Sequence, residues 1–435
     1  MTSAPASCDA GAVSKPRDGD ETKPAEPRVP LTPYQRKLML FLSVATFFEG
    51  FDFFAFTQIL PNLRAEFGLG KLGAGVLTAV IYTGPILAYF LVRRADRVGR
   101  KPILSLTIAG YTIFTLLSGL APDVWTFAIA QLAARVFLIG EWSIAMVFAA
   151  EEFPAAKRGL VIGVIQAFSS LGGVVCAGVV PVIVKLPWGW RSVFFVGAVP
   201  LIAVAFARRG IRETARFTAG AATRSADAAP LFRIWRTPWR NRVVLLAFIW
   251  GLTYLCTTTG ITFWKEFAIE ERGFTDAQVG ASLAIAAVAA MPLVFMVGPT
   301  IEWLGRRVGA IIMFIAAAGG IALSYTLTSP AGLTAALAVG IFGTSAVLPV
   351  MNAYTAELFP TEIRGDGFAW SNNLLGRLGA VAGPLIVGAM AADTGWGPAV
   401  LATCGGPIIA LVLILATLPE TRGRELEDTS ALPGH

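Results

Sequence analysis

The sequence contains about twelve long, continuous apolar runs, and no other feature limits its possible folds as strongly. They fall near residues 38–60, 74–92, 102–121, 125–149, 160–184, 191–208, 242–264, 278–300, 308–328, 333–356, 367–392 and 397–418. About 20 mostly apolar residues suffice to cross a bilayer as a helix. Backbone polar groups in lipid must be satisfied within the segment, and the runs do not alternate in polarity, so we expect helices and not a barrel.

Composition supports the same conclusion. Hydrophobic residues make up 55% of the 435 residues and charged residues only 14%, whereas soluble domains carry about 25% charge. The mean hydropathy is +0.67. We therefore predict an all-α membrane protein with twelve transmembrane helices.

The polar segments divide the chain into two sets of six helices. We expect a disordered cytoplasmic tail (1–33), an N-terminal half (34–208), a basic cytoplasmic linker (209–241), a C-terminal half (242–418) and a cytoplasmic tail (419–435). Lys and Arg are concentrated in the tails and in the even-numbered connections. Because positively charged loops stay in the cytoplasm, both termini are predicted to be cytoplasmic.

Two connections of the first half return in the second half at one common spacing. V-R-R-A-D-R-V-G-R-K at 92–101 matches G-P-T-I-E-W-L-G-R-R at 298–307, and E-E-F-P-A-A-K-R-G at 151–159 matches E-L-F-P-T-E-I-R-G at 357–365. Both pairs are 206 residues apart. Duplicated halves are typical of transporters that bind substrate between the halves near the middle of the membrane. The repeat therefore predicts transport of a small molecule.

These motifs resemble those of the major facilitator superfamily from about Leu38 to Glu427. D-R-V-G-R-K at 96–101 is similar to the family's loop signature, and R-E-T-A-R-F at 212–217 and P-E-T-R-G-R-E-L at 419–426 resemble motifs of its metabolite and sugar branches. E-G-F-D in the first run and G-E-W in the fourth resemble bacterial metabolite and aromatic-acid proton symporters. The resemblance implies two duplicated halves, alternating access, and a monomer in the bacterial inner membrane that takes up a small organic anion with protons.

The sequence also departs from other branches of this family. Val92 stands where the loop signature has glycine, and L-T-Y-L-C-T-T-T-G at 252–260 lacks the paired glutamines of sugar porters. The fifth run, from Gly163, lacks the G-P pair of drug–proton antiporters. Proton-coupled efflux of amphipathic compounds, sugar or polyol symport, and a non-transporting membrane receptor remain the alternatives.

Charged residues within the apolar runs are the strongest candidates for function. A charged side chain at the bilayer centre costs about 2.5–3.5 kcal/mol on insertion scales and usually faces a cavity or a partner. Five occupy the middle portions of their runs and are predicted to surround one cavity: Glu49, Asp52, Arg135, Glu141 and Arg377.

Glu49 and Asp52 are three residues apart, so a helix places them on one face. A carboxyl group partly removed from water can alternate between charged and neutral forms, and Asp52, which matches the resemblance better, is the preferred proton carrier. Arg135 is the expected neighbouring charge, and the alternative is a permanent ion pair that braces two helices. Glu141 lies on another face of the Arg135 helix, either as a second proton site or as a structural acid.

Arg377 is the predicted anchor for a substrate carboxylate, since its guanidinium group offers five donors in a planar fork. Asn373, four residues earlier, would lie on the same helical face and orient it. The alternative is that Arg377 pairs with an acid of the protein. The neutral candidates for substrate binding are Tyr254, Thr258, Gln166 and, for stacking on a flat substrate, Phe54.

The charged loop residues suit a different role. Family resemblance implies that they form a cytoplasmic gate, which holds the two halves together when the outside is open. The alternative is that they only set the topology, although acids at repeated positions favour the gate. The set comprises Asp96, Arg97, Arg100, Glu152, Arg158, Glu302, Arg306, Glu357 and Arg364.

The residue inventory argues against several other classes of protein. Four cysteines lie far apart and the single histidine is His435, so we expect no metal site and no cofactor. No G-x-x-x-x-G-K-[ST] motif or nucleophile–base arrangement is visible, and we expect no enzymatic activity. The net charge of +7 is dispersed over short loops, which predicts a lipid bilayer and no nucleic acid as the partner.

Overall fold

The computed structural model describes residues 31–198, 212–213, 232–422 and 429. Eleven helices in this part of the chain are long and apolar enough to cross a membrane. Part of the sixth predicted run, 191–208, lies outside the described residues. The all-α, twelve-helix prediction is confirmed.

Helices of the N-terminal half comprise α1 (Pro33–Phe67), α2 (Lys71–Tyr82), α3 (Gly84–Val98), α4 (Arg100–Gly119), α5 (Val124–Glu152) and α6 (Ala155–Ile183), and residues 191–198 are also helical. Those of the C-terminal half are α9 (Arg240–Thr262), α10 (Trp264–Glu270), α11 (Asp276–Leu304), α12 (Arg306–Thr326), α13 (Pro330–Glu357), α14 (Arg364–Phe368), the π-helix η4 (Ala369–Gly376), α15 (Leu378–Thr394), α16 (Trp396–Thr403) and α17 (Gly405–Thr417). A short 3₁₀ helix, η3 (Arg233–Arg236), precedes α9.

Helix α1 is longer than the apolar run that predicted it. Thr32 and Gln35 form a capping box at its start, and Gly68, with φ of 63°, ends it in the left-handed conformation. Its 35 residues span roughly 50 Å at 1.5 Å per residue, well beyond a hydrocarbon core of about 30 Å. Glu49 and Asp52 therefore lie at mid-helix, while Arg64 belongs to the last turn and not to a loop.

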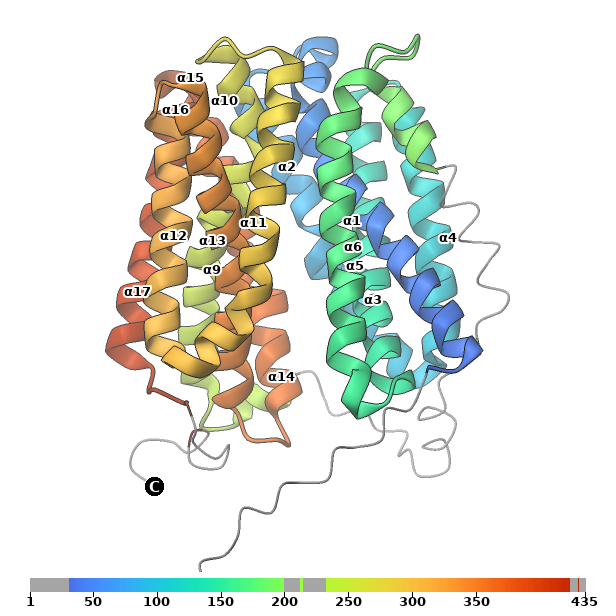
Figure 1. The fold of residues 1–435 in the computed structure, drawn as a ribbon, viewed down its shortest axis with the longest axis vertical. Helices are drawn as coiled ribbons and strands as arrows, with labels where there is room; N and C mark the ends of the chain where they lie inside the picture. The colour runs from blue at the N-terminus through green and yellow to red at the C-terminus, as the bar shows by residue number, and fades with distance from the viewer. Residues whose placement is uncertain (1–30, 199–211, 214–231, 423–428, 430–435) are drawn as a thin grey trace, which may run out of the picture.

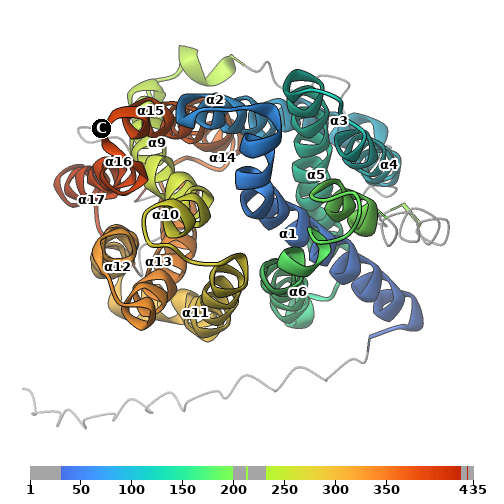
Figure 2. The same cartoon turned by 90° about the horizontal axis from the view of Figure 1, so that it is seen from above.

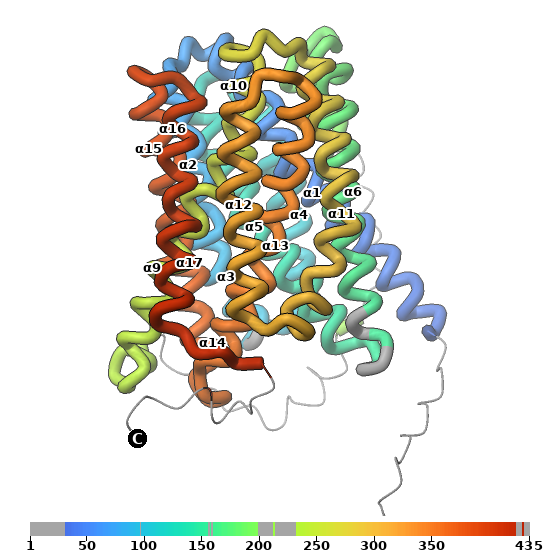
Figure 3. The backbone as a smooth tube through the Cα atoms, turned by 60° about the vertical axis from the view of Figure 1, so that its left-hand side comes forward, coloured from blue at the N-terminus to red at the C-terminus, as the bar shows by residue number. Residues whose placement is uncertain are grey.

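Helices α10 and α14 lie at opposite ends of the bundle (Figure 1). The tube view shows the same polarity, with α14 at the end opposite α10 (Figure 3). We call the α14 end the near end and the α10 end the far end. Seen along the bundle, α2 lies beside α15 and α11 beside α6, so these pairs join the two halves (Figure 2).

The apolar core is continuous between the halves only toward the far end. One cluster of buried residues joins Phe56 of α1 and Phe194 to Phe263 and Trp396 of the other half. Toward the near end the core is split into two clusters. One belongs to the N-terminal half and surrounds Phe148, and the other belongs to the C-terminal half.

Close backbone contacts strengthen the far end. A Cβ atom on Gly75 of α2 would lie 2.4 Å from the Pro384 carbonyl oxygen of α15, and one on Gly280 of α11 would lie 2.6 Å from the Ala177 carbonyl oxygen of α6. Small residues permit such helix contacts in membranes. Larger side chains at these positions would force the halves apart.

Two cysteines meet although they are far apart in sequence. The sulfur atoms of Cys256 and Cys404 lie 3.8 Å apart, and both residues are buried as free thiols.

Candidate functional site

The four predicted charges of the N-terminal half come together in its interior. Asp52 of α1 is 6% exposed, and Arg135 and Glu141 of α5 are 2% and 3% exposed. Glu49 interacts electrostatically with all three of these residues. Tyr111 of α4 lies within electrostatic reach of the whole group, and its hydroxyl donates a hydrogen bond of 3.4 Å to the Phe48 carbonyl oxygen.

Arg135 lies over the ring of Phe53 and has no ion pair among the described residues, so the structure does not show the alternative bracing pair. Among the described residues, no carboxylate oxygen lies within 4.0 Å of its guanidinium nitrogens, and neither terminal nitrogen has a hydrogen-bond partner. Its guanidinium carbon lies 4.9 Å from the ring centroid of Phe53, which is stacked on Tyr82. The Tyr82 hydroxyl shares a hydrogen bond of 2.8 Å with Thr262 of the other half.

Arg377 lies in the C-terminal half over the ring of Tyr254. Its guanidinium carbon is 4.7 Å from the ring centroid, a cation–π distance. The Tyr254 hydroxyl donates a hydrogen bond of 2.8 Å to Oδ1 of Asn372, and the ring stacks on Trp250. Within the described chain, no carboxylate pairs with Arg377.

A π-helical segment determines which asparagine orients this group. Over Ala369–Gly376 the backbone is a π-helix, and the Arg377 N–H donates to the Asn372 carbonyl oxygen five residues earlier. The prediction assumed α-helical spacing and therefore chose Asn373. In the structure Asn372 is the asparagine that bonds Tyr254, and the role of Asn373 stays a prediction. Single π-turns within α-helices are frequent at functional sites.

The neutral candidates take up different positions. The Thr258 hydroxyl donates to the Tyr254 carbonyl oxygen at 2.5 Å, so it is satisfied by its own helix. Gln166 of α6 is exposed, and Phe54 is partly buried against the core beside Gly173. Phe53, which the prediction did not name, is the α1 ring that contacts Arg135.

The charged residues of the near end form two equivalent clusters, one in each half. Nη2 of Arg100 donates to Glu151 at 3.1 Å, and Nη2 of Arg306 donates to Glu357 at 2.8 Å. Each pair is separated from its counterpart by the 206 residues of the sequence repeat. Arg306 also bonds Glu302 at 2.8 Å.

Each cluster also receives an acid from the end of its own half. The Glu213 carboxylate accepts hydrogen bonds from the backbone N–H groups of Arg100 and Lys101 at the start of α4. Glu420 does the same for Arg306 and Arg307 at the start of α12, with both distances 2.9 Å. A helix N-terminus attracts anions. Burial raises the pKa of Glu420, but these backbone donors outweigh it and hold the pKa below its usual value.

The structure adds one acid to the predicted gate residues. Glu151, the neighbour of Glu152, pairs with Arg100, and the common spacing of 206 residues to Glu357 was the signal, while Glu152 stays a prediction. Arg364 donates to the Phe359 carbonyl oxygen and Arg97 is exposed. The side chains of Asp96 and Arg158 lie outside the described part of the structure.

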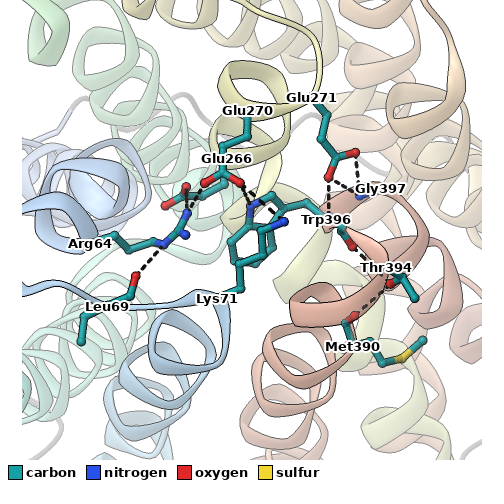
Figure 4. A network of polar contacts seen from close by, with 11 residues as sticks. Arg64, Leu69, Lys71, Glu266, Glu270, Glu271, Met390, Thr394, Trp396 and Gly397 are labelled. Atoms are coloured by element: carbon teal, nitrogen blue, oxygen red, sulfur yellow. Dashed lines mark hydrogen bonds and ion pairs between the residues drawn. The ribbon is translucent and has the colours of Figure 1, made fainter.

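A third charged cluster, at the far end, joins the two halves (Figure 4). Arg64 of α1 pairs with Glu266 of α10 at 2.5 Å and also with Glu270. Lys71 at the start of α2 lies 3.6 Å from Glu270. We call these four residues, together with Trp396, the far-end cluster.

Trp396 completes this cluster as a platform. Its ring lies under both cations of the N-terminal half, 5.2 Å from Arg64 and 5.6 Å from Lys71. Its indole nitrogen donates to Glu270 at 3.0 Å, and its backbone N–H donates to Glu271. In the sequence these residues lie in or next to the connections between apolar runs. No repeat or spacing relates them to one another, so the sequence did not predict that they meet.

Comparison with known proteins identifies the family to which the sequence is similar. The sequence model of the family described as Major Facilitator Superfamily matches residues 42–380 and, in a second match, 268–433. A D-xylose–proton symporter of known crystal structure has the same fold, with a TM-score of 0.69 over 90% of this chain and 99% of that one at 19% identity.

Three curated relatives match over most of their length. A putative niacin/nicotinamide transporter of Bacillus subtilis is 25% identical, covering 90% of this chain and 98% of the relative. A probable 4-methylmuconolactone transporter of Cupriavidus pinatubonensis is 28% identical, covering 93% and 95%. A gentisate transporter of Corynebacterium glutamicum is 26% identical, covering 79% of each.

Proposed function

The chain belongs to the major facilitator superfamily, a family of transporters and not of enzymes, and on this premise we propose that it takes up a small organic anion together with protons. The substrate class is a carboxylate, with an aromatic acid favoured. The mechanism is alternating access, in which the two halves open the site to one side of the membrane at a time.

The observation that carries this proposal is the environment of Arg377. A permanently charged guanidinium group inside a membrane bundle normally has a counter-ion, because an unpaired buried charge is costly. Arg377 instead rests on the ring of Tyr254, with no carboxylate partner in the described chain. A substrate carboxylate would supply that counter-ion, and the adjoining aromatic rings would accommodate a flat substrate.

The buried acids of the opposite half support proton coupling. Glu49 and Asp52 lie within electrostatic reach of Arg135, and Glu141 lies within reach of Glu49; among the described residues no ion pair fixes any of these acids as a carboxylate. Such groups suit reversible protonation. We retain Asp52 as the preferred proton carrier because Arg135 and Tyr111 are its polar neighbours.

The two ends of the molecule support alternating access. At the far end the halves share a core and the far-end cluster, whereas at the near end each half keeps its own core and its own charged cluster. Positive charge in the connections assigns the near end, with both termini, to the cytoplasm of a bacterial inner membrane. This arrangement corresponds to the inward-facing state of a monomeric transporter.

The relatives narrow the substrate class. One of them is named for niacin and nicotinamide and another for gentisate; niacin and gentisate are aromatic carboxylic acids, and nicotinamide is the neutral amide of niacin. A fixed cation beside aromatic rings matches that chemistry. We therefore favour aromatic acids over sugars, polyols and amphipathic drugs.

Thermal unfolding of the purified protein with matched ligands tests the substrate class. Each aromatic acid is compared with its primary amide, which keeps the shape and removes the charge. A ligand that binds only the folded state stabilises it by about 2.7 kcal/mol at one hundred times its Kd. We expect stabilisation by at least one acid and none by its amide. Equal effects of acid and amide would contradict the anion site, and stabilisation only by amphipathic compounds would favour efflux.

A further inference from the structure

One carboxyl group is sealed inside the contact between the halves, away from the central acids. Glu266 of α10 is 1% exposed and lies in the far-end cluster. One of its oxygens is 2.5 Å from Arg64 of α1, and the other has no hydrogen-bond partner among the described residues. Glu266 therefore becomes buried only when the two halves meet at this end.

The charged groups around Glu266 and its partners come from α1, α2, α10 and α11. Arg64 comes from α1, while Glu270 and Lys265 come from α10 itself. Lys265 is also buried, and it bonds the Gln58 carbonyl oxygen of α1 at 2.6 Å and Asp276 of α11 at 2.7 Å. Lys71 of α2 faces Glu270. Three cations and three acids thus meet at this contact, with Asp276 and Glu270 partly open to solvent, and each cation has a carboxylate other than Glu266.

Because Glu270 is present, Arg64 does not need a negative charge on Glu266 to remain paired. Arg64 is bonded to Glu270 as well as to Glu266, so a neutral Glu266 leaves this arginine paired. Removing a carboxylate from water favours its protonated form. Burial raises the pKa of Glu266 from its ordinary value of 4.5 to about 7, outweighing the opposite effect of Arg64.

We propose that Glu266 is a second proton-binding residue of this transporter, which takes a proton from the outside as the far end closes and returns it to the outside when that end reopens. The inference rests on the alternating access of the proposed function and adds a proton site outside the central acids. In the closed state the proton is held as a neutral carboxyl group, and Arg64 keeps its ion pair with Glu270. Because this proton enters and leaves on the same side, it is not transported.

Proton binding by Glu266 is linked to closure of the far end, and this linkage determines how the ratio of open to closed forms changes with pH. Glu266 has the higher pKa when the far end is closed and an ordinary value when it is open to water. Low pH therefore stabilises the closed form, and this stabilisation is lost as pH rises through about 7. With pKa values of about 7 closed and 4.5 open, the ratio of open to closed falls about tenfold from pH 8 to pH 6.

The test measures the distance between spin labels at two exposed far-end positions, one in each half. Leu186 and Thr328 are replaced by cysteine after the four native cysteines are replaced by serine. In the parent protein we expect the ratio of the longer-distance to the shorter-distance population to fall about tenfold between pH 8 and pH 6. Glu266→Gln mimics the neutral carboxyl group, so the long-distance population should be small and independent of pH across this interval.

Two further variants separate the proton site from general weakening of the contact. Glu270→Gln removes the acid that bonds Arg64, Lys71 and Trp396 and leaves Glu266 as the carboxylate of Arg64, so the open population should rise and its pH dependence should move to lower pH. Glu66→Gln is the matched control, because Glu66 lies at the same end but bonds Arg191 and Trp190 within its own half. This control should behave as the parent.

The outcomes are distinguishable. A pH profile of Glu266→Gln identical to that of the parent would overturn the inference and leave the proposed function intact. If no condition produces a second distance population, alternating access itself fails. The proton-to-substrate ratio of transport provides a second measurement. It should be unchanged in Glu266→Gln, and a loss of one proton would show that Glu266 carries a transported proton instead.

Discussion

Arg135 of the N-terminal half and Arg377 of the C-terminal half each lie over an aromatic ring. Phe53 contacts Arg135 at 4.9 Å and Tyr254 contacts Arg377 at 4.7 Å. Glu49 and Asp52 lie within electrostatic reach of Arg135, whereas no carboxylate of the described residues pairs with Arg377. We therefore propose different roles for the two cations. Arg135 influences the protonation of the neighbouring acids, and Arg377 binds the carboxylate of the substrate.

Replacing Arg377 tests its role as anchor. Charge-assisted hydrogen bonds contribute about 1.5–3 kcal/mol, so Arg377→Ala should weaken binding of an aromatic acid by roughly 10- to 150-fold. Arg377→Lys keeps the charge but not the planar fork, and should weaken binding less. Affinity is measured by calorimetry on purified protein, with the neutral amide as reference ligand. Undiminished affinity in Arg377→Ala would remove this assignment.

Replacing Asp52 separates coupling from binding. Asp52→Asn preserves the shape of the side chain but cannot release a proton, so accumulation driven by a proton gradient should be lost while exchange of substrate across the membrane continues. Glu49→Gln is the matched control on the same helix face and should retain gradient-driven accumulation. Both activities are followed with radiolabelled substrate in proteoliposomes. Proton-driven accumulation by Asp52→Asn at the parental level would transfer the role to another acid.

At the scale of the elements, the helices follow from the sequence because hydrophobic length determines a membrane span. The apolar runs predicted α4, α5 and α13 to within a few residues. The π-helix at Ala369–Gly376 could not be predicted, because its altered hydrogen bonding depends on tertiary packing and not on apolar periodicity. For the same reason Asn373 was chosen where Asn372 makes the contact with Tyr254.

Closure of the far end depends on the contact between α2 and α15. Gly75→Val would place side-chain atoms where even a Cβ is 2.4 Å from the Pro384 carbonyl oxygen, so the halves could not close there. We expect the transport rate to fall by more than about tenfold, since 1.4 kcal/mol in favour of the open form already shifts the equilibrium tenfold. Transport and substrate affinity are measured on the same preparation.

Gly163→Ala is the control for the Gly75→Val substitution, because a Cβ on Gly163 of α6 would meet no atom within 4 Å. It should transport at the parental rate. Normal transport by Gly75→Val would show that the α2–α15 contact does not have to close during the cycle.

At the scale of the whole molecule, the two ends are built differently. The near-end clusters around Arg100 and Arg306 are copies related by the sequence repeat, which is why the sequence predicted most of their members. The far-end cluster is a single assembly of residues from both halves, such as Arg64 and Glu266. Its pairs depend on how the halves pack, and one sequence read alone does not contain that information.

Alternating access predicts opposite movements at the two ends. A near-end label pair at Leu160 and Trp303, which are both exposed and belong to different halves, is compared with the far-end pair at Leu186 and Thr328. Conditions that lengthen the far-end distance should shorten the near-end distance. Distances that change together, or at one end only, would contradict this mechanism.

Uptake into proteoliposomes under an imposed inward proton gradient tests the central claim most directly. A panel of aromatic and aliphatic carboxylic acids is offered, each with its primary amide as control, with and without a protonophore. We predict accumulation of at least one acid above its external concentration, abolished by the protonophore and absent for its amide. If the gradient drives no accumulation of any carboxylate, proton-coupled uptake of an organic anion is wrong.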